Sequence, residues 1–221
     1  MIWIFGDSYS TSFNHISVIN DWGRDYINFK GYVPKSFGDI ISDELGVEVK
    51  HIARCGICND TIYELICENA PLINKDDIII IGWSELTRFR LSGRDSEWCH
   101  LISNFQNNFS ELPNVSENTL NEIFVNRSLK LYVDEYMKRR NFLNWLFRDN
   151  ILIHWTPFVH QFKFILGYGG IITIIDETKD VVKNRHYSET GHKQLSNNFI
   201  ELIDNDNLRE MYNNISGVKL L

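Results

Sequence analysis

The chain has 221 residues, of which 43% are hydrophobic and 23% are charged, and its formal net charge at pH 7 is −7. This length is sufficient for one sizeable hydrophobic core, so we predict a single domain over residues 1–221. The negative net charge argues against nucleic acid as a partner, because binding to nucleic acid depends on neutralising phosphates with Lys and Arg.

The sequence also lacks targeting and membrane signals. No apolar stretch approaches the roughly 18 residues that a membrane-spanning helix needs, and the N-terminal segment has neither a basic start nor a small-residue cleavage site. We therefore predict a cytoplasmic protein without membrane contact. The four cysteines fit a reducing compartment, and the Cys55/Cys58 pair has no second pair at zinc-site spacing, so no metal is predicted.

The first predicted element is a buried strand at residues 2–5, a short apolar run that ends in the polar turn Gly6-Asp7-Ser8. Residues 9–33 mix aromatic side chains with Asn, Asp and Gly, which predicts a long irregular loop beside the end of that strand. Any chemistry is therefore expected to begin at this turn.

Hydrophobic periodicity and boundary residues predict the later elements. The predicted helices begin near Pro34, at the cap Asn59-Asp60-Thr61, at about Glu117 and near Ser188. The predicted strands cover residues 47–53, 78–81, 151–155 and 171–175. The run Ile78–Ile81 is entirely β-branched, which is typical of a central parallel strand buried on both faces. Residues 86–116 are predicted to be a surface insertion.

Alternating strands and helices favour a parallel sheet that is covered on both faces. We predict an α/β fold, a three-layer α/β/α arrangement with a flavodoxin-like, mainly parallel, five-stranded sheet. In such sheets ligands bind beyond the carboxyl ends of the strands. Ser8, Gly56, Ser84 and the segment around His186 all follow predicted strands or precede the last helix, so we expect them to meet at that edge.

Four short blocks of the sequence carry a family resemblance. They are Gly6–Ser8 after the first strand, Ala53–Asp60, Gly82–Glu85 after the β-branched run, and Asn184–His192 before the last helix. In this order they resemble the blocks of the SGNH/GDSL hydrolases, which are serine esterases. The resemblance implies hydrolysis of a carboxylic ester or a related acyl transfer, with a small-molecule or carbohydrate ester as substrate and no metal or organic cofactor.

Serine catalysis needs a base that takes the hydroxyl proton and a third group that orients the base. The resemblance makes Ser8 the nucleophile and His186 the base. The family usually has an Asp three residues before the His, where this sequence has Lys183. The third group is therefore left open between Asn184, a backbone carbonyl, Asp176 and Asp180, with Asn184 as the first choice.

The resemblance also predicts an oxyanion hole formed by the backbone N–H groups of Ser8 and Gly56 and by the Ser84 side chain. Ser84 stands where the family has Asn, and a hydroxyl reaches less far than an amide. Loss of one such donor typically costs about 10²–10³ in rate, so this departure affects efficiency more than reaction type. Three further residues are predicted to contact the substrate: Asp7, Asn59 and Trp83.

Two other functions compete with the esterase prediction. The departures at Ser84 and Lys183 favour a catalytically weak or inactive SGNH-fold module that binds carbohydrate or protein. The predicted sheet would also suit a flavodoxin-like nucleotide or redox domain. However, the sequence contains neither a Gly-x-Gly-x-x-Gly segment nor a P-loop, which argues against that second alternative.

Overall fold

The apolar runs that were predicted to be strands form the centre of a parallel sheet. The computed structural model describes residues 1–19, 22–86, 88–89, 100–101, 129–158 and 186–206. The strand order is β2-β1-β3-β6, and all three pairings between neighbouring strands are parallel. The strands are β1 (Ile2–Gly6), β2 (Val49–His51), β3 (Ile78–Gly82) and β6 (Ile151–Trp155). The chain is thus an α/β protein.

The β-branched run occupies the central position that its composition predicts. β3 lies between β1 and β6, where Ile80 is aligned with Ile4 on one side and with Ile153 on the other. All residues of β1 and the last four of β3 are buried. Continuous burial on both faces is why these strands do not alternate with polar residues.

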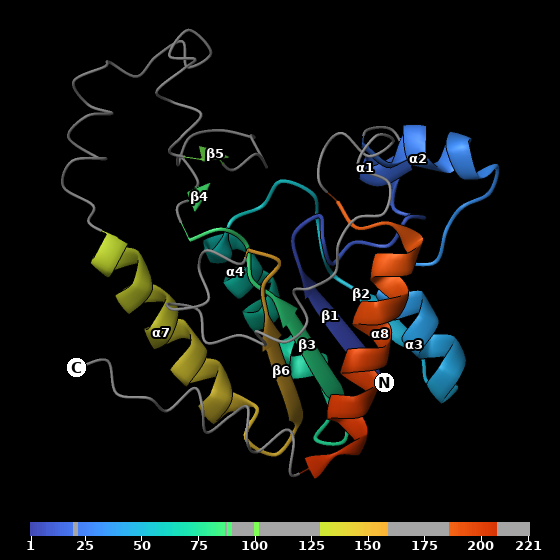
Figure 1. Cartoon of the computed structure of the whole chain (residues 1–221). Coiled ribbons are helices and arrows are strands. Elements are labelled where there is room, and N and C mark those ends of the chain that lie inside the picture. The colour runs from blue at the N-terminus through green and yellow to red at the C-terminus, as the bar shows by residue number, and fades with distance from the viewer. Residues whose placement is uncertain (20–21, 87, 90–99, 102–128, 159–185, 207–221) are drawn as a thin grey trace, which may run out of the picture.

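Helices surround this sheet (Figure 1). They are α1 (Ile16–Ile19), α2 (Trp22–Lys30), α3 (Phe37–Leu45), α4 (Asn59–Asn69), the short 3-10 turn η1 (Ala70–Leu72), α7 (Leu129–Leu146) and α8 (Glu189–Asp204). In the predicted insertion, β4 (Arg88–Phe89) and β5 (His100–Leu101) form an antiparallel pair. None of the described helices is both long and apolar enough to cross a membrane.

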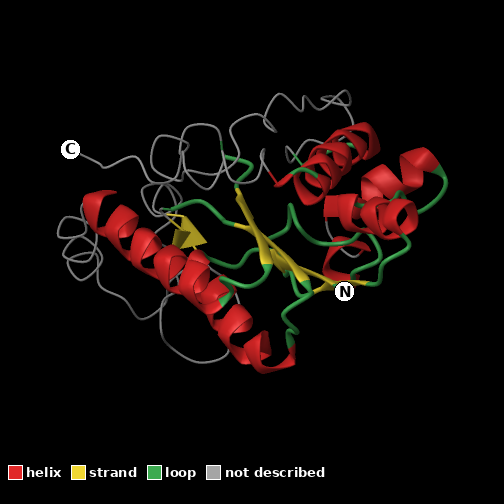
Figure 2. Ribbon diagram, turned by 90° about the horizontal axis from the view of Figure 1, so that it is seen from below, coloured by secondary structure: helices red, strands yellow, loops and turns green. Residues whose placement is uncertain are grey.

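Alternate side chains of a strand point to opposite faces of the sheet. Helices lie on both sides of the sheet (Figure 2). Trp3 and Phe5 of β1 belong to a buried cluster that includes residues of α4 and α7. Ile2 and Ile4 of the same strand belong to a second cluster with residues of α3 and α8. The sheet therefore has a hydrophobic core on both sides.

Several predicted boundaries differ from the structure, among them the cap predicted at Asn59-Asp60-Thr61, because α4 already begins at Asn59 and its N-cap is Cys58. Residues 9–33, predicted as an irregular loop, contain α1 and α2, because Phe13, Val18 and Tyr26 bury their side chains together and give this segment its own small core. The predicted strand at 171–175 and the first part of the helix predicted from Glu117 lie outside the described residues.

The helix predicted from Pro34 begins at Phe37 instead. Ser36 is the N-cap, and its side chain accepts a hydrogen bond from the Asp39 N–H while the Asp39 carboxylate accepts one from the Ser36 N–H. This reciprocal capping box satisfies two donors that the helix itself leaves unpaired, so it sets the start of the helix more strongly than the proline does.

Two glycines at the ends of neighbouring strands allow the chain to turn closely over the sheet. Gly6 of β1 is aligned with Gly82 of β3, and the Ser10 side chain packs over both. A Cβ on Gly82 would overlap Ser10 Oγ and lie 2.9 Å from Trp155 Nε1, while a Cβ on Gly6 would lie 2.8 Å from the Gly82 carbonyl oxygen. Only glycine leaves room for the loop that follows β1.

Gly82→Ala is therefore expected to lower the free energy of unfolding by about 2–3 kcal/mol, because it overfills a packed site. Gly46→Ala is a suitable comparison, since Gly46 has a positive φ of 63° but no atom within 4 Å of an added Cβ. Its cost should be only the backbone term of about 1 kcal/mol. Urea unfolding of both variants measures the difference, and an equal cost at the two positions would contradict the crowding described for Gly82.

Candidate active site

The carboxyl ends of the strands face the edge of the sheet where α1 and α2 lie (Figure 1). After β1 the chain makes a tight turn in which the Ser10 N–H donates to the Asp7 carbonyl oxygen at 3.0 Å. The Thr11 hydroxyl donates to the same oxygen, also at 3.0 Å. Ser8 is a central residue of this turn, so the sheet holds its side chain at the end of the strand.

His186 is placed by the start of α8. Ser188 is the N-cap of that helix, as predicted, and its hydroxyl accepts from the Gly191 N–H at 3.2 Å. The Glu189 N–H donates to the Tyr26 hydroxyl at 2.8 Å, which ties the first turn of α8 to α2. His186 lies two residues before the cap, so both contacts restrict where its ring can go.

The structure brings Ser8 and His186 together, although they are 178 positions apart in the chain. His186 Nε2 lies 2.7 Å from Ser8 Oγ. The hydroxyl donates in this contact when Nε2 carries no proton, which is the tautomer that a general base requires. Three candidates for orienting the opposite nitrogen, Asn184, Asp176 and Asp180, lie outside the described residues.

An aromatic cluster fixes the plane of the His186 ring. The Tyr9 ring stacks on the imidazole with a centroid distance of 4.7 Å and an interplanar angle of 23°. Tyr9 is in turn held by edge contacts to Phe158 at 5.6 Å and Tyr187 at 5.4 Å. The face of a tyrosine ring is electron-rich and attracts cations, so this stacking favours the imidazolium form that a base acquires.

Asp7 supports the turn from inside the protein. Its side chain is 1% exposed and accepts from the Tyr9 N–H at 3.1 Å, while the Arg88 guanidinium lies 3.5 Å away. Burial raises the pKa of Asp7, and the charge of Arg88, the nearby Ser84 hydroxyl and the Tyr9 N–H oppose that rise. Arg88 also donates to the Ile57 carbonyl oxygen at 3.3 Å.

Gly56 lies in the turn that follows β2. The Ile52 N–H donates to the Ile4 carbonyl oxygen at 2.8 Å, and the Arg54 N–H donates to the Gly6 carbonyl oxygen at 3.1 Å. This segment therefore runs beside β1 as far as its last residue. Gly56 comes next, with a φ of 77° that glycine adopts without strain. Its backbone is thus at the same edge of the sheet as Ser8.

Ser84 is fully buried, and its backbone is held by Asn59. The Ser84 N–H donates to Asn59 Oδ1 at 2.8 Å, and Asn59 Nδ2 donates to the Ser84 carbonyl oxygen at 3.1 Å. Ser84 Oγ lies near the Asp7 carboxylate but makes no hydrogen bond of normal geometry with a described residue. Asn59 thus connects the start of α4 to the turn after β3.

The Trp83 side chain is directed away from solvent. It is 0% exposed, and its indole N–H donates to His154 Nδ1 at 3.0 Å. His154 Nε2 lies 3.0 Å from Asn144 Oδ1, so the neutral ring uses one nitrogen as acceptor and the other as donor. Burial, aided by the charge of Arg140, lowers the pKa of His154 well below its usual value and keeps it neutral.

The three residues predicted to contact the substrate require a correction. Asp7, Asn59 and Trp83 are 1%, 5% and 0% exposed, and their polar atoms contact protein groups. Each immediately follows a strand or begins a helix, where a buried polar side chain must find an internal partner. We assign them to supporting the site rather than to binding the substrate.

Two residues of the site, Tyr9 and Arg88, were not predicted from the sequence. Tyr9 directly follows Ser8 in the sequence, but its stacking on His186 depends on the far end of the chain. Arg88 belongs to the segment predicted to be a surface insertion, and no local pattern marks it as the partner of Asp7. The described residues contain no group of three or more His, Cys, Asp or Glu side chains that could hold a metal ion.

Comparisons of the chain with protein-family models, with curated proteins and with solved structures find no match. Assignment of chemistry to this site therefore depends on its own geometry.

Proposed function

We propose that this protein is a hydrolase of carboxylic esters, of the esterase or deacetylase type, that works through an acyl-enzyme. The observation that carries the proposal is the 2.7 Å contact between His186 Nε2 and Ser8 Oγ. A nucleophile and a base within hydrogen-bond reach form the minimal arrangement for serine catalysis. The site also lies beyond the carboxyl ends of parallel strands, where α/β proteins bind ligands.

In the proposed acylation step, Ser8 Oγ attacks the acyl carbon while His186 Nε2 takes the hydroxyl proton. The tetrahedral intermediate collapses, the bond to the alcohol oxygen breaks, and the imidazolium returns its proton to that leaving oxygen. The stacked Tyr9 ring stabilises the transient positive charge on the imidazole. The products of this half-reaction are the free alcohol and an ester between the acyl group and Ser8.

In the proposed deacylation step, His186 takes a proton from a water molecule, and the resulting hydroxide attacks the acyl-Ser8 carbon. The bond to Ser8 Oγ then breaks, and the serine recovers its proton from the imidazolium. The carboxylic acid is released, and the enzyme returns to its starting state. No metal or organic cofactor takes part in either half-reaction.

The proposed oxyanion hole consists mainly of the Ser8 and Gly56 backbone N–H groups. Ser84 is the weaker part of the proposal, because its hydroxyl is fully buried beside the Asp7 carboxylate. We propose that Ser84 acts chiefly by shaping the turn that Asn59 holds. A site with two donors in place of three is expected to be slower by about 10²–10³.

The same proposal extends to the fold and the family. We propose that the chain has the three-layer α/β/α, flavodoxin-like architecture of the SGNH/GDSL hydrolases, with residues 171–175 as the fifth strand. The hydrophobic clusters on both faces of the sheet support this arrangement. The proposed substrate is a small-molecule or carbohydrate ester, hydrolysed in the cytoplasm.

Labelling with a fluorophosphonate probe tests the proposal, because the probe reacts only with an activated serine. We expect the wild-type protein to be labelled and Ser8→Ala to lose the label. Ser42→Ala provides a control, since Ser42 Oγ donates to the Val47 carbonyl oxygen and takes no part in the Ser8–His186 dyad. A wild-type protein that stays unlabelled and does not hydrolyse p-nitrophenyl acetate above the buffer rate would favour the binding module instead.

A further inference from the structure

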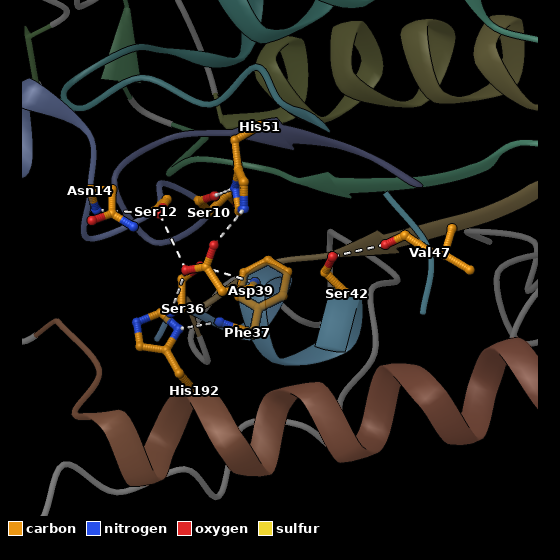
Figure 3. A network of polar contacts seen from close by, with 10 residues as sticks. All are labelled: Ser10, Ser12, Asn14, Ser36, Phe37, Asp39, Ser42, Val47, His51 and His192. Atoms are coloured by element: carbon orange, nitrogen blue, oxygen red, sulfur yellow. Dashed lines mark hydrogen bonds and ion pairs between the residues drawn. The ribbon is translucent and has the colours of Figure 1, made fainter. Parts of the chain in front are cut away.

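The first turn of α3 contacts both of the chain segments that carry the dyad (Figure 3). On one side it meets the loop after β1, through Ser12, four residues after Ser8. On the other side it meets α8, through His192, six residues after His186. The loop after β1 and the start of α8 are not paired as strands. Their relative position therefore depends on α3, which contacts both.

Asp39 forms the contact with the loop of the nucleophile. Its Oδ2 accepts from Ser12 Oγ at 3.2 Å, from Ser36 Oγ at 2.6 Å and from the Ser36 N–H at 2.8 Å. The last of these is part of the capping box of α3. One carboxylate thus joins the start of α3 to the loop that carries Ser8, and hydrogen bonds to a charged acceptor are stronger than neutral ones.

His51 provides a second connection to the same loop. His51 Nδ1 lies 3.2 Å from the Ser10 carbonyl oxygen, and Nε2 lies 3.9 Å from Asp39 Oδ1. Because a carbonyl oxygen can only accept, Nδ1 carries the proton in this contact. Burial lowers the pKa of His51, although the Asp39 carboxylate and the contact with Ser10 oppose this.

His192 forms the contact with α8. Its ring is 2% exposed, and Nδ1 accepts from the Phe37 N–H at 3.2 Å. The ring also stacks near Phe37 with a centroid distance of 6.0 Å and meets Phe13 edge-on at 5.2 Å. His192 therefore satisfies a backbone donor at the start of α3 and packs against the loop of the nucleophile.

Close approach of α3 to the sheet makes these contacts possible. A Cβ on Gly38 would lie 2.6 Å from Ile4 Cδ1 and 2.6 Å from His51 Nε2. Any larger residue at this position would push the first turn of α3 away from β1 and β2. The sequence Ser36-Phe37-Gly38-Asp39 thus combines a capping box with a glycine at the point where α3 lies close to Ile4 and His51.

We propose that the first turn of α3 holds Ser8 in register with His186, with Asp39 and Ser12 as positioning residues for the nucleophile and His192 as the positioning residue for the base. This inference rests on the proposed ester hydrolysis. Its physical basis is that reacting groups must be held closely, since a displacement of about 1 Å can cost roughly 10²-fold in rate.

Ser12→Ala tests the inference, because it removes the contact with the loop and leaves the capping box of Ser36 and Asp39 intact. We expect kcat for p-nitrophenyl acetate and the rate of fluorophosphonate labelling to fall by roughly 10-fold, with little change in KM. Ser12→Thr keeps the hydroxyl and should recover most of the rate. Ser42→Ala is the control, since it removes a side-chain hydrogen bond of α3 at 2.9 Å, whereas Ser12→Ala removes the bond to Asp39 and the one that Ser12 Oγ accepts from the Asn14 N–H at 3.3 Å.

The control separates positioning from a general loss of stability. Ser12→Ala and Ser42→Ala are expected to lower Tm by similar amounts, while only Ser12→Ala lowers kcat. Equal kcat values for the two variants, in a wild-type protein that is labelled, would overturn this inference and leave the proposed function standing. A wild-type protein that is neither labelled nor active would overturn both.

Discussion

Ser8→Ala and His186→Gln are each expected to lower kcat for ester hydrolysis by about 10⁴–10⁶-fold, and the double variant by no more than the larger single effect. The reason is that the proposed mechanism makes the two side chains act as one unit across the 2.7 Å contact. A serine without its base is a poor nucleophile, and a base without its serine has no proton to take. Once either side chain is replaced, replacing the other should therefore lower kcat no further.

A double-mutant cycle on p-nitrophenyl acetate measures this non-additivity. Ser42→Ala serves again as the control and should stay within about twofold of wild type, because Ser42 Oγ contacts the Val47 carbonyl oxygen and neither Ser8 nor His186. Far-ultraviolet circular dichroism verifies that each variant keeps its fold. If the double variant fell by the product of the single effects, the two residues would act independently and the dyad would be wrong.

The second large effect is the loss of stability at acid pH. Lowering the pH from 6.5 to 4 is expected to cost about 3 kcal/mol of unfolding free energy through His192 alone. Burial lowers the pKa of His192 to about 4 in the folded protein, despite the opposing charge of Asp39, against an ordinary value of 6.5. Between these values the unfolded chain binds a proton that the folded protein does not, so stability falls as the pH falls.

His51 and His154 change stability in the same direction, because burial lowers the pKa of each. The Asp7 carboxyl acts in the opposite direction, since its raised pKa makes the folded protein bind a proton more readily than the unfolded chain does. The neutral histidines outnumber it. The net expectation is a protein that loses stability progressively below pH 6.5.

Urea unfolding of the wild type and of His192→Asn at several pH values between 4 and 7 measures the contribution of His192. Asparagine offers an acceptor in place of Nδ1 for the Phe37 N–H but does not titrate. The variant should be less dependent on pH over this range. Parallel curves for the two proteins would show that His192 is not the source of the acid sensitivity.

Several elements could be predicted from the chain alone because their signals are local. The apolar run at the start of the chain and the β-branched run Ile78–Ile81 are strands of a parallel sheet, since only residues buried on both faces can be continuously apolar. Ser188 caps α8 as predicted, because a cap depends on neighbours three residues away. The capping box of Ser36 and Asp39 is a local signal of the same kind, and it places the start of α3 at Phe37 although Pro34 also suits a first helical turn.

The candidate site, too, could be predicted from the sequence only in part. The sequence by itself determined which residue types follow the strand ends, and therefore nominated Ser8, Gly56 and His186. Only the tertiary structure decided that Ser8 and His186 lie 2.7 Å apart and that Asp7, Asn59 and Trp83 are buried. It also decided that Asp39 contacts Ser12, in the loop after Ser8, and that His192 of α8 contacts Phe37 at the start of α3. Burial and side-chain contact depend on segments far apart in the chain that fold against each other, and local periodicity carries no information about those pairings.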